Sequence, residues 1–175
     1  MNKLDFPSEN FIENYLISKI DADNHCVVAD EEVDGAFRQV DLGSYGIADI
    51  VKFIWHPDMM VITVMELKNE TLKPAHLAQL CRYVTCVKNI AKRYQRFINI
   101  EVYGELVGPF EKSNDLPYLI NHIDENISVY DLRLSLDSGV VSDGVGRGWY
   151  KDDKASTYFP VIKKSLRVIR DVNDA

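Results

Sequence analysis

Three charged residues stand at the ends of two neighbouring apolar segments in the middle of the chain. Asp49 begins the segment that runs to Trp55, and Glu66 and Lys68 end the segment that begins at Val61. Two carboxylates and an ammonium group at the rim of a buried sheet are costly unless something uses them. A divalent cation and a phosphodiester would use them, because carboxylate oxygens are suitable ligands for hard cations.

A β-hairpin would bring these three residues together. A four-residue loop between the two segments pairs Trp55 with Met60 and places Asp49 directly opposite Glu66. Because side chains alternate along a strand, Asp49, Glu66 and Lys68 then share one face. Directly opposed carboxylates repel each other, and a bound cation would remove that penalty. The alternative is an internal salt bridge, in which Lys68 neutralises one carboxylate at the sheet edge.

Further residues extend this pattern on both sides. Gly46 precedes Asp49 by three positions, and Glu13 is the acid of an otherwise largely apolar helical segment. Gln79 and Tyr83 are four residues apart and so share a helical face. In this order the residues resemble the PD-(D/E)XK phosphodiesterase superfamily, and more narrowly its QxxxY, RecB-like nuclease branch. That branch is marked by a helix glutamate, GxxD, ExK and QxxxY, and the resemblance covers about half the chain.

The resemblance implies a metal-dependent nuclease that hydrolyses DNA phosphodiester bonds with a metal-activated water. Asp49, Glu66 and the backbone carbonyl of Leu67 would hold one or two Mg²⁺ or Mn²⁺ ions. Lys68 would orient the attacking water or stabilise the charge that develops on the phosphate. Glu13 would contribute through a metal-bound water or as an outer ligand.

Gln79 and Tyr83 would position the acidic groups or a DNA phosphate by hydrogen bonding. For these residues a purely structural alternative stays open. Tyr83 would then be an ordinary residue of an amphipathic helix, and Glu13 would simply face solvent.

Basic residues accumulate along the helix that contains Gln79. Arg82, Lys88, Lys92 and Arg93 could form a local track for DNA phosphates. A solvated face with cations near the helix C-terminus is the alternative. The net charge of the chain is −7, so any binding to a polyanion must come from such a local patch or from metal ions.

The 175 residues, 46% of them hydrophobic, predict a single domain with a substantial core. The order of the elements predicted from the apolar residues favours an α/β fold, with α+β as the alternative. The resemblance implies a restriction-endonuclease-like core with a mixed central β-sheet flanked by helices, over about 8–107, and a C-terminal elaboration over about 108–175. The predicted helices are 8–20, 74–94 and 116–123. The predicted strands lie within 36–55, 61–67, 97–107 and 127–136. The predicted loops are 21–24, 30–35 and 137–148, and 158–172 is a predicted terminal amphipathic segment.

The sequence predicts a cytoplasmic protein with reduced thiols. Its three cysteines form no CxxC pair and have no zinc-site spacing. The first residues contain no apolar signal region, and no apolar run reaches the roughly 20 residues that span a bilayer.

Two other functions fit the same residues. One is a catalytically silent protein with a nuclease fold that binds DNA or another protein. The other is a restriction-type endonuclease that acts as a homodimer. The sequence does not separate exonuclease from endonuclease activity, or DNA from RNA as the substrate.

Overall fold

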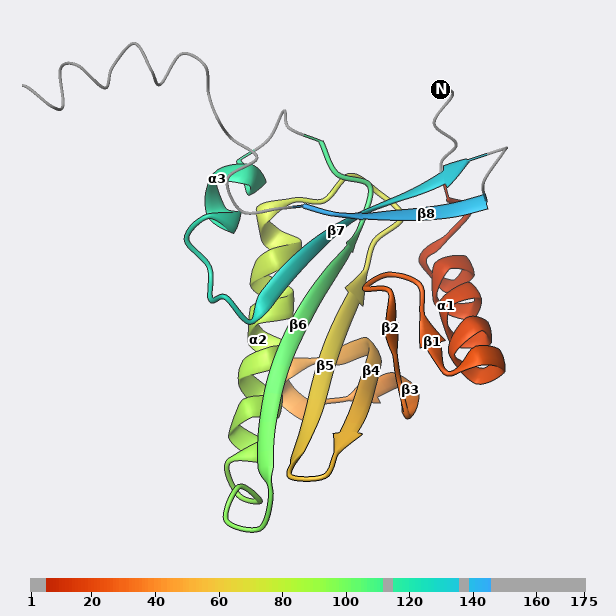
Figure 1. Ribbon diagram of the computed structural model, residues 1–175. Coiled ribbons are helices and arrows are strands. Elements are labelled where there is room, and N and C mark those ends of the chain that lie inside the picture. The colour runs from red at the N-terminus through yellow and green to blue at the C-terminus, as the bar shows by residue number, and fades with distance from the viewer. Residues whose placement is uncertain (1–5, 112–114, 136–138, 146–175) are drawn as a thin grey trace, which may run out of the picture.

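The computed structural model describes residues 6–111, 115–135 and 139–145, which form a mixed sheet flanked by helices (Figure 1). The helices are α1 (Glu9–Asp23), α2 (Pro74–Ala91) and α3 (Leu116–Ile120), with a 3₁₀ turn η1 (Gly43–Tyr45). The strands are β1 (His25–Cys26), β2 (Glu31–Glu32), β3 (Gly35–Asp41), β4 (Ile47–His56), β5 (Met59–Leu67), β6 (Asn99–Gly108), β7 (Ile127–Ser135) and β8 (Gly139–Gly144).

Six of these strands form one sheet in the order β3-β4-β5-β6-β7-β8. The pairs β5–β6 and β6–β7 are parallel and the other neighbours are antiparallel. Parallel neighbours need a crossover connection, which α2 provides between β5 and β6. The predicted α/β class with a mixed sheet and flanking helices is therefore confirmed. Because β7 and β8 belong to the same sheet, the chain beyond residue 107 completes it.

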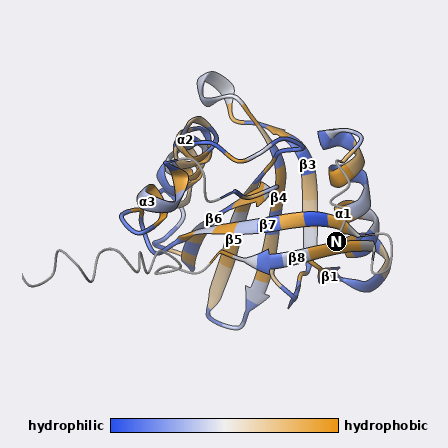
Figure 2. Ribbon diagram, turned by 90° about the horizontal axis from the view of Figure 1, so that it is seen from above, coloured by the Kyte–Doolittle hydropathy of each residue, from blue (hydrophilic) through white to orange (hydrophobic). Residues whose placement is uncertain are grey.

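The helices cover opposite faces of this sheet (Figure 2). Leu77, Leu80 and Val84 of α2 pack with Val64 and Val102 in one core cluster, as their helical spacing predicts. The other cluster joins Ile12, Leu16 and Ile20 of α1 to the opposite face of β4, β5 and β6. Strand β5 is buried on both faces, which explains its nearly continuous apolar sequence.

Helix α1 begins where the sequence predicts. The Oγ atom of Ser8 accepts a hydrogen bond from the Phe11 N–H at 3.1 Å, so Ser8 is the N-cap. The helix ends at Asn24, which adopts a left-handed conformation with φ 51°.

Four sequence predictions need correction. The predicted loop 21–24 is instead the last part of α1 and its C-cap, Asn24. The loop between β4 and β5 has two residues, Pro57 and Asp58, because His56 pairs with Met59; the register beyond it, with Trp55 opposite Met60, is as predicted. The predicted loop 30–35 contains β2, which pairs with β1 in a small separate sheet. Strand β8 occupies half of the predicted loop 137–148, where glycine and serine residues still form a hydrogen-bonded strand at the edge of the sheet. The predicted segment 158–172 lies outside the described residues.

Within the described ranges, no helix is both long enough and apolar enough to cross a membrane.

A buried group of ions lies on the α1 side of the sheet. Lys52 of β4 is fully buried, and its Nζ atom lies 2.9 Å from Oε2 of Glu105 on β6 and forms an ion pair with Glu31 of β2. Burial disfavours the charged lysine, but the two carboxylates outweigh it and raise the Lys52 pKa. The ion pair with Glu31 therefore fastens the small β1–β2 sheet to the large one.

Candidate active site

The charged residues of the predicted site meet near the C-terminal end of β5, but not by regular strand pairing. The β4–β5 ladder ends at the pair Ile50–Met65, one position before Asp49 and Glu66. In place of the next pair, the Leu67 N–H donates to the Asp49 carboxylate, with 2.8 Å between Leu67 N and Asp49 Oδ2. Asp49 and Glu66 are therefore not the ladder pair that the sequence predicted. Instead, the Asp49 side chain accepts a backbone hydrogen bond from β5 at the open end of the hairpin.

The strand on the other side of β4 is also irregular at Asp49. Gln39 of β3, which would pair with Asp49, has a positive φ of 46° and is absent from the β3–β4 ladder. On β4 itself, Ala48 packs in the core cluster of α2, whereas Ile50 packs in that of α1. The regular alternation of faces therefore stops between Ala48 and Ile50, so simple alternation along β4 does not determine the face on which Asp49 lies.

Glu66 and Lys68 form a close ion pair. The Lys68 Nζ atom lies 2.7 Å from Glu66 Oε1 and 3.5 Å from Oε1 of Glu9, in the first turn of α1. Glu66 is only 1% exposed, and its other oxygen, Oε2, is buried and has no hydrogen-bond partner among the residues that the structure describes. Leaving a carboxylate oxygen buried and unpaired costs free energy. The salt bridge proposed as an alternative thus exists, and it satisfies only half of the Glu66 carboxylate.

The pKa values at the site are perturbed mainly by burial. Burial and then the charge of Asp49 raise the pKa of Glu66 to about 7. Burial also raises the pKa of Asp49, against the Leu67 hydrogen bond and the charge of Lys68. For Lys68, burial favours the neutral amine, but its hydrogen bond to Glu66 and the surrounding acids outweigh burial and raise its pKa. Lys68 therefore stays charged while Glu66 is poised to lose a proton near neutrality.

Glu13 is a buried residue of α1, so the alternative that it faces solvent is wrong. Arg38 Nε donates to Glu13 Oε1 at 2.5 Å, and Gln39 Nε2 donates to Oε2 at 2.6 Å. The same Gln39 nitrogen lies 3.5 Å from Asp49 Oδ1. Because both Glu13 oxygens already accept hydrogen bonds, Glu13 is placed to orient Gln39 beside Asp49.

Three of these neighbours were not predicted from the sequence: Glu9, Arg38 and Gln39. Glu9 stands four residues before Glu13, and this spacing on one helix face was a usable signal. Nothing in the sequence marks Gln39 as a residue with positive φ, since that conformation is uncommon for any residue other than glycine.

Gln79 and Tyr83 contact each other and the glycine of the GxxD segment. Gln79 Nε2 donates to Tyr83 Oη at 2.8 Å. A Cβ atom placed on Gly46 would lie only 2.9 Å from Tyr83 Oη, and Gly46 has φ 117°. Among the described contacts, neither Gln79 nor Tyr83 bonds to Asp49 or Glu66. The QxxxY residues therefore meet the site through the backbone at Gly46, three residues before Asp49.

Gly46→Ala is expected to destabilise the protein by about 1–3 kcal/mol. The alanine would have to adopt the positive φ of Gly46, and its methyl group would clash with the hydroxyl of the buried Tyr83. Urea unfolding of the variant measures this change. Gly43 has φ 64° and open space around it, so Gly43→Ala is a control that measures the cost of an alanine at positive φ without a steric clash. An equal effect of both substitutions would contradict the packing role of Gly46.

Among the residues that the structure describes, no group of three or more His, Cys, Asp and Glu side chains is arranged to hold a metal ion. The predicted site is smaller, with two carboxylates and a backbone carbonyl. Comparisons with protein-family models, curated proteins and solved structures find no match. The function of the site is therefore inferred from the geometry of its residues.

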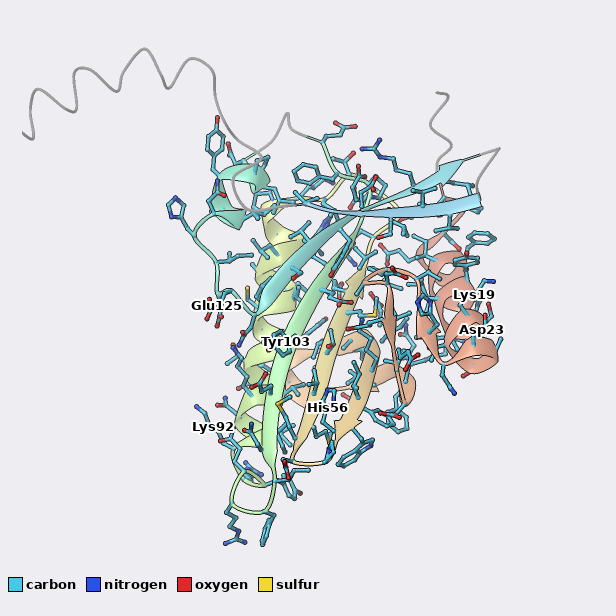
Figure 3. All side chains as sticks on the ribbon, in the orientation of Figure 1. Lys19, Asp23, His56, Lys92, Tyr103 and Glu125 are labelled. Atoms are coloured by element: carbon cyan, nitrogen blue, oxygen red, sulfur yellow. The ribbon has the colours of Figure 1, made fainter. Side chains whose placement is uncertain are left out.

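The predicted DNA track is not assembled at this site. Arg82, Lys92 and Arg93 are exposed, whereas Lys88 forms an ion pair with Asp124, with 3.0 Å between Nζ and Oδ2. At 1.5 Å per helical residue, Lys92 lies about 20 Å along α2 from Gln79. Figure 3 shows Lys92 at the end of α2 away from the tip of β5. Arg82, one turn from Gln79, is the basic residue of this set closest to the site along the helix.

Proposed function

We propose that this protein is a metal-dependent nuclease with a restriction-endonuclease-like fold, and that it hydrolyses DNA phosphodiester bonds at the Asp49–Glu66–Lys68 site. The observation that carries the proposal is the Glu66 carboxylate. It is buried, one of its oxygens has no hydrogen-bond partner within the described ranges, and its pKa is raised to about 7. Perturbed buried acids of this kind are typical of functional sites.

The charge balance of the site favours a divalent cation. Four carboxylates, on Glu9, Glu13, Asp49 and Glu66, interact here with the cations of Lys68 and Arg38. When all six groups are ionised, four negative and two positive charges leave a net charge of −2, which one Mg²⁺ or Mn²⁺ ion would neutralise. Oxygen donors match these hard cations, so the residues fit the predicted metal.

Asp49 and Glu66, with the Leu67 carbonyl, would hold the ion. Of the two Asp49 carboxylate oxygens, Oδ1 is the more available to an ion, since Gln39 Nε2 lies 3.5 Å from it whereas the Leu67 N–H donates to Oδ2 at 2.8 Å. The ion would supply Lewis-acid activation of water and charge neutralisation at phosphate. Lys68 would donate from Nζ to the phosphate or the attacking water, and Glu66 would give up its proton when the ion binds.

The residues around these groups would keep them in place. Arg38 and Gln39 hold the Glu13 carboxylate, and Gln39 in turn lies beside Asp49. Tyr83 supports the backbone at Gly46. Positioning of this kind contributes to catalysis because the reacting groups must be held in a narrow range of geometries.

A second candidate is a nuclease-fold protein that binds DNA or a protein partner without cutting. The observation that favours it is the Lys68–Glu66 ion pair, which already neutralises one carboxylate. Mn²⁺ binding and DNA cleavage distinguish the two functions, because only the nuclease cleaves DNA with Mn²⁺. A homodimeric endonuclease differs from both by producing discrete fragments from plasmid DNA.

Cleavage of DNA in the presence of Mn²⁺ tests the proposal. Single-stranded DNA, double-stranded DNA and RNA are incubated with Mn²⁺ or with a chelator, and products are separated on denaturing gels. We expect cleavage only with Mn²⁺, and at least about 100-fold less with Asp49→Asn, since outer-shell metal partners alone contribute 10–100-fold. Asp21→Asn, an exposed position on α1, is the matched control.

Cleavage that persists in the chelator, or that is equal in Asp49→Asn and the unaltered chain, would contradict the metal site. Calorimetric titration with Mn²⁺ separates the remaining cases. Binding that depends on Asp49 without cleavage would favour the accessory function.

A further inference from the structure

A cavity of about 420 Å³ lies at the exposed part of β6, far from the candidate active site along α2. Its lining includes Lys92 at the end of α2, Tyr103 of β6 and Glu125 before β7, all labelled in Figure 3. Its volume is in the range of sites that bind ligands. None of its lining residues takes part in the proposed hydrolysis.

At this cavity, half of β6 has no neighbouring strand on the side away from β5 among the described residues. Strand β5 pairs with β6 from Asn99 to Val107, whereas β7 pairs with β6 only from Gly104 onward. Over the five residues 99–103, β6 is therefore an edge strand, although it lies in the middle of the sheet order.

The backbone groups of alternate residues point to this open edge. The Gly104 N–H donates to the Asn126 carbonyl beside β7, whereas the Val107 carbonyl accepts from the Lys68 N–H beside β5. The backbone N–H and C=O groups of the even-numbered residues of β6 thus point away from β5, as alternation in a parallel ladder requires. Ile100 and Val102 then present their backbone groups to the cavity.

One of these backbone groups, the Ile100 carbonyl, already accepts a hydrogen bond within the protein. Gln95 Nε2 donates to the Ile100 carbonyl at 3.3 Å. In the described part of the chain, no group pairs with the Val102 N–H or C=O on this side, although Val102 is only 4% exposed. Backbone groups of buried residues are nearly always paired, so these call for a hydrogen-bonding ligand.

The two walls of the cavity carry opposite charges. Lys88 and Lys92 line it from α2, on one face of the sheet. Glu101 and Tyr103 project from the opposite face of β6, where Tyr103 Oη donates to Glu101 Oε2 at 2.7 Å, and the charge of nearby Glu125 acts on Tyr103. A strand added here would alternate its side chains between a basic wall and an acidic wall.

We propose that the open edge of β6 binds an extended peptide segment of a partner protein by strand addition. The peptide backbone pairs with Ile100 and Val102. Acidic side chains at every second position face Lys88 and Lys92, and basic side chains between them face Glu101 and Glu125. Main-chain bonds supply affinity and the alternating charges supply specificity.

A hexapeptide library displayed on phage, selected on the full-length protein, tests this. We expect enriched sequences with acids at every second position and bases between them. Lys92→Glu should weaken binding of a selected hexapeptide at least 10-fold. Lys19→Glu, the same charge change on α1 beyond the opposite face of the sheet, should leave it unchanged.

Hydrogen exchange read by NMR examines the backbone pairing. The selected hexapeptide should slow exchange of the Ile100 and Val102 amides at least 10-fold, and replacing its central residue by proline should abolish the effect. Absence of enrichment, equal binding to Lys92→Glu, or unprotected amides would each overturn the proposal. Protection that grows with protein concentration in the absence of peptide would identify a second copy as the occupant and would also overturn it.

Discussion

Lys68→Ala is expected to lower the rate of DNA cleavage by about 10²–10³-fold at saturating Mn²⁺, the range measured when one preorganised donor to a developing charge is removed. Lys68 Nζ lies 2.7 Å from Glu66 and retains its charge because its pKa is raised. Its ammonium group is thus held beside the metal-binding carboxylate that we propose. Single-turnover cleavage assays of the variant and the unaltered chain measure the effect.

A structural role for Lys68 makes a different prediction. If Lys68 only neutralises Glu66, its loss raises the Glu66 pKa further and weakens Mn²⁺ binding near neutral pH. Cleavage would then recover at pH 9 with saturating Mn²⁺, because Glu66 is ionised there. A catalytic Lys68 leaves the defect in place at pH 9. Lys73→Ala is the matched control, since Lys73 is also ion-paired but exposed.

Glu66→Gln is expected to stabilise the protein without metal above pH 7 and to remove its stabilisation by Mn²⁺. The folded-state pKa of Glu66, about 7, lies above its ordinary value of 4.5. The folded state therefore binds more protons than the unfolded state between these values, and stability falls as pH rises through this window. At 1.36 kcal/mol per pH unit the full loss is at most about 3 kcal/mol, and the neutral glutamine avoids it.

Urea unfolding at pH 4.5 and pH 8 measures this difference. The variant and the unaltered chain should be similar in stability at the lower pH, and the variant should be more stable at the higher pH. Mn²⁺ at pH 8 should stabilise only the unaltered chain, because a ligand stabilises the state that binds it. Glu32→Gln, at an exposed position, is the control. A Glu66→Gln variant that is less stable at pH 8 would show that the ionised carboxylate stabilises the fold.

The hairpin that carries the site could be predicted because its signals are local. Counting a four-residue loop between the two apolar segments gave the correct register from Trp55–Met60 onward, even though His56 and Met59 also pair and the turn is two residues shorter than expected. Two-residue strands such as β1 and β2 contain too few residues for any period to be recognised. Strand β8 was not predicted because its glycine and serine residues are typical of turns, and its pairing with β7 is a tertiary contact.

The site could be predicted as a set of residues but not as a geometry. Asp49, Glu66 and Lys68 do come together, yet the left-handed Gln39 on a different strand interrupts the β3–β4 ladder at Asp49. Such a local backbone conformation depends on packing between elements and leaves no periodic signal. The partners of Glu13 on β3 depend on the same three-dimensional arrangement, with 25 residues between Glu13 and Arg38.

The buried ion group at Lys52 constrains how the sequence can diverge. Loss of Lys52 alone would leave Glu105 and Glu31 without their cation in the interior, and breaking a buried ion pair in this way costs about 3–5 kcal/mol. Joint replacement of the three residues by apolar side chains of similar volume is often nearly neutral. We therefore expect positions 31, 52 and 105 to be epistatic, because each of the three residues limits which substitutions the other two can accept.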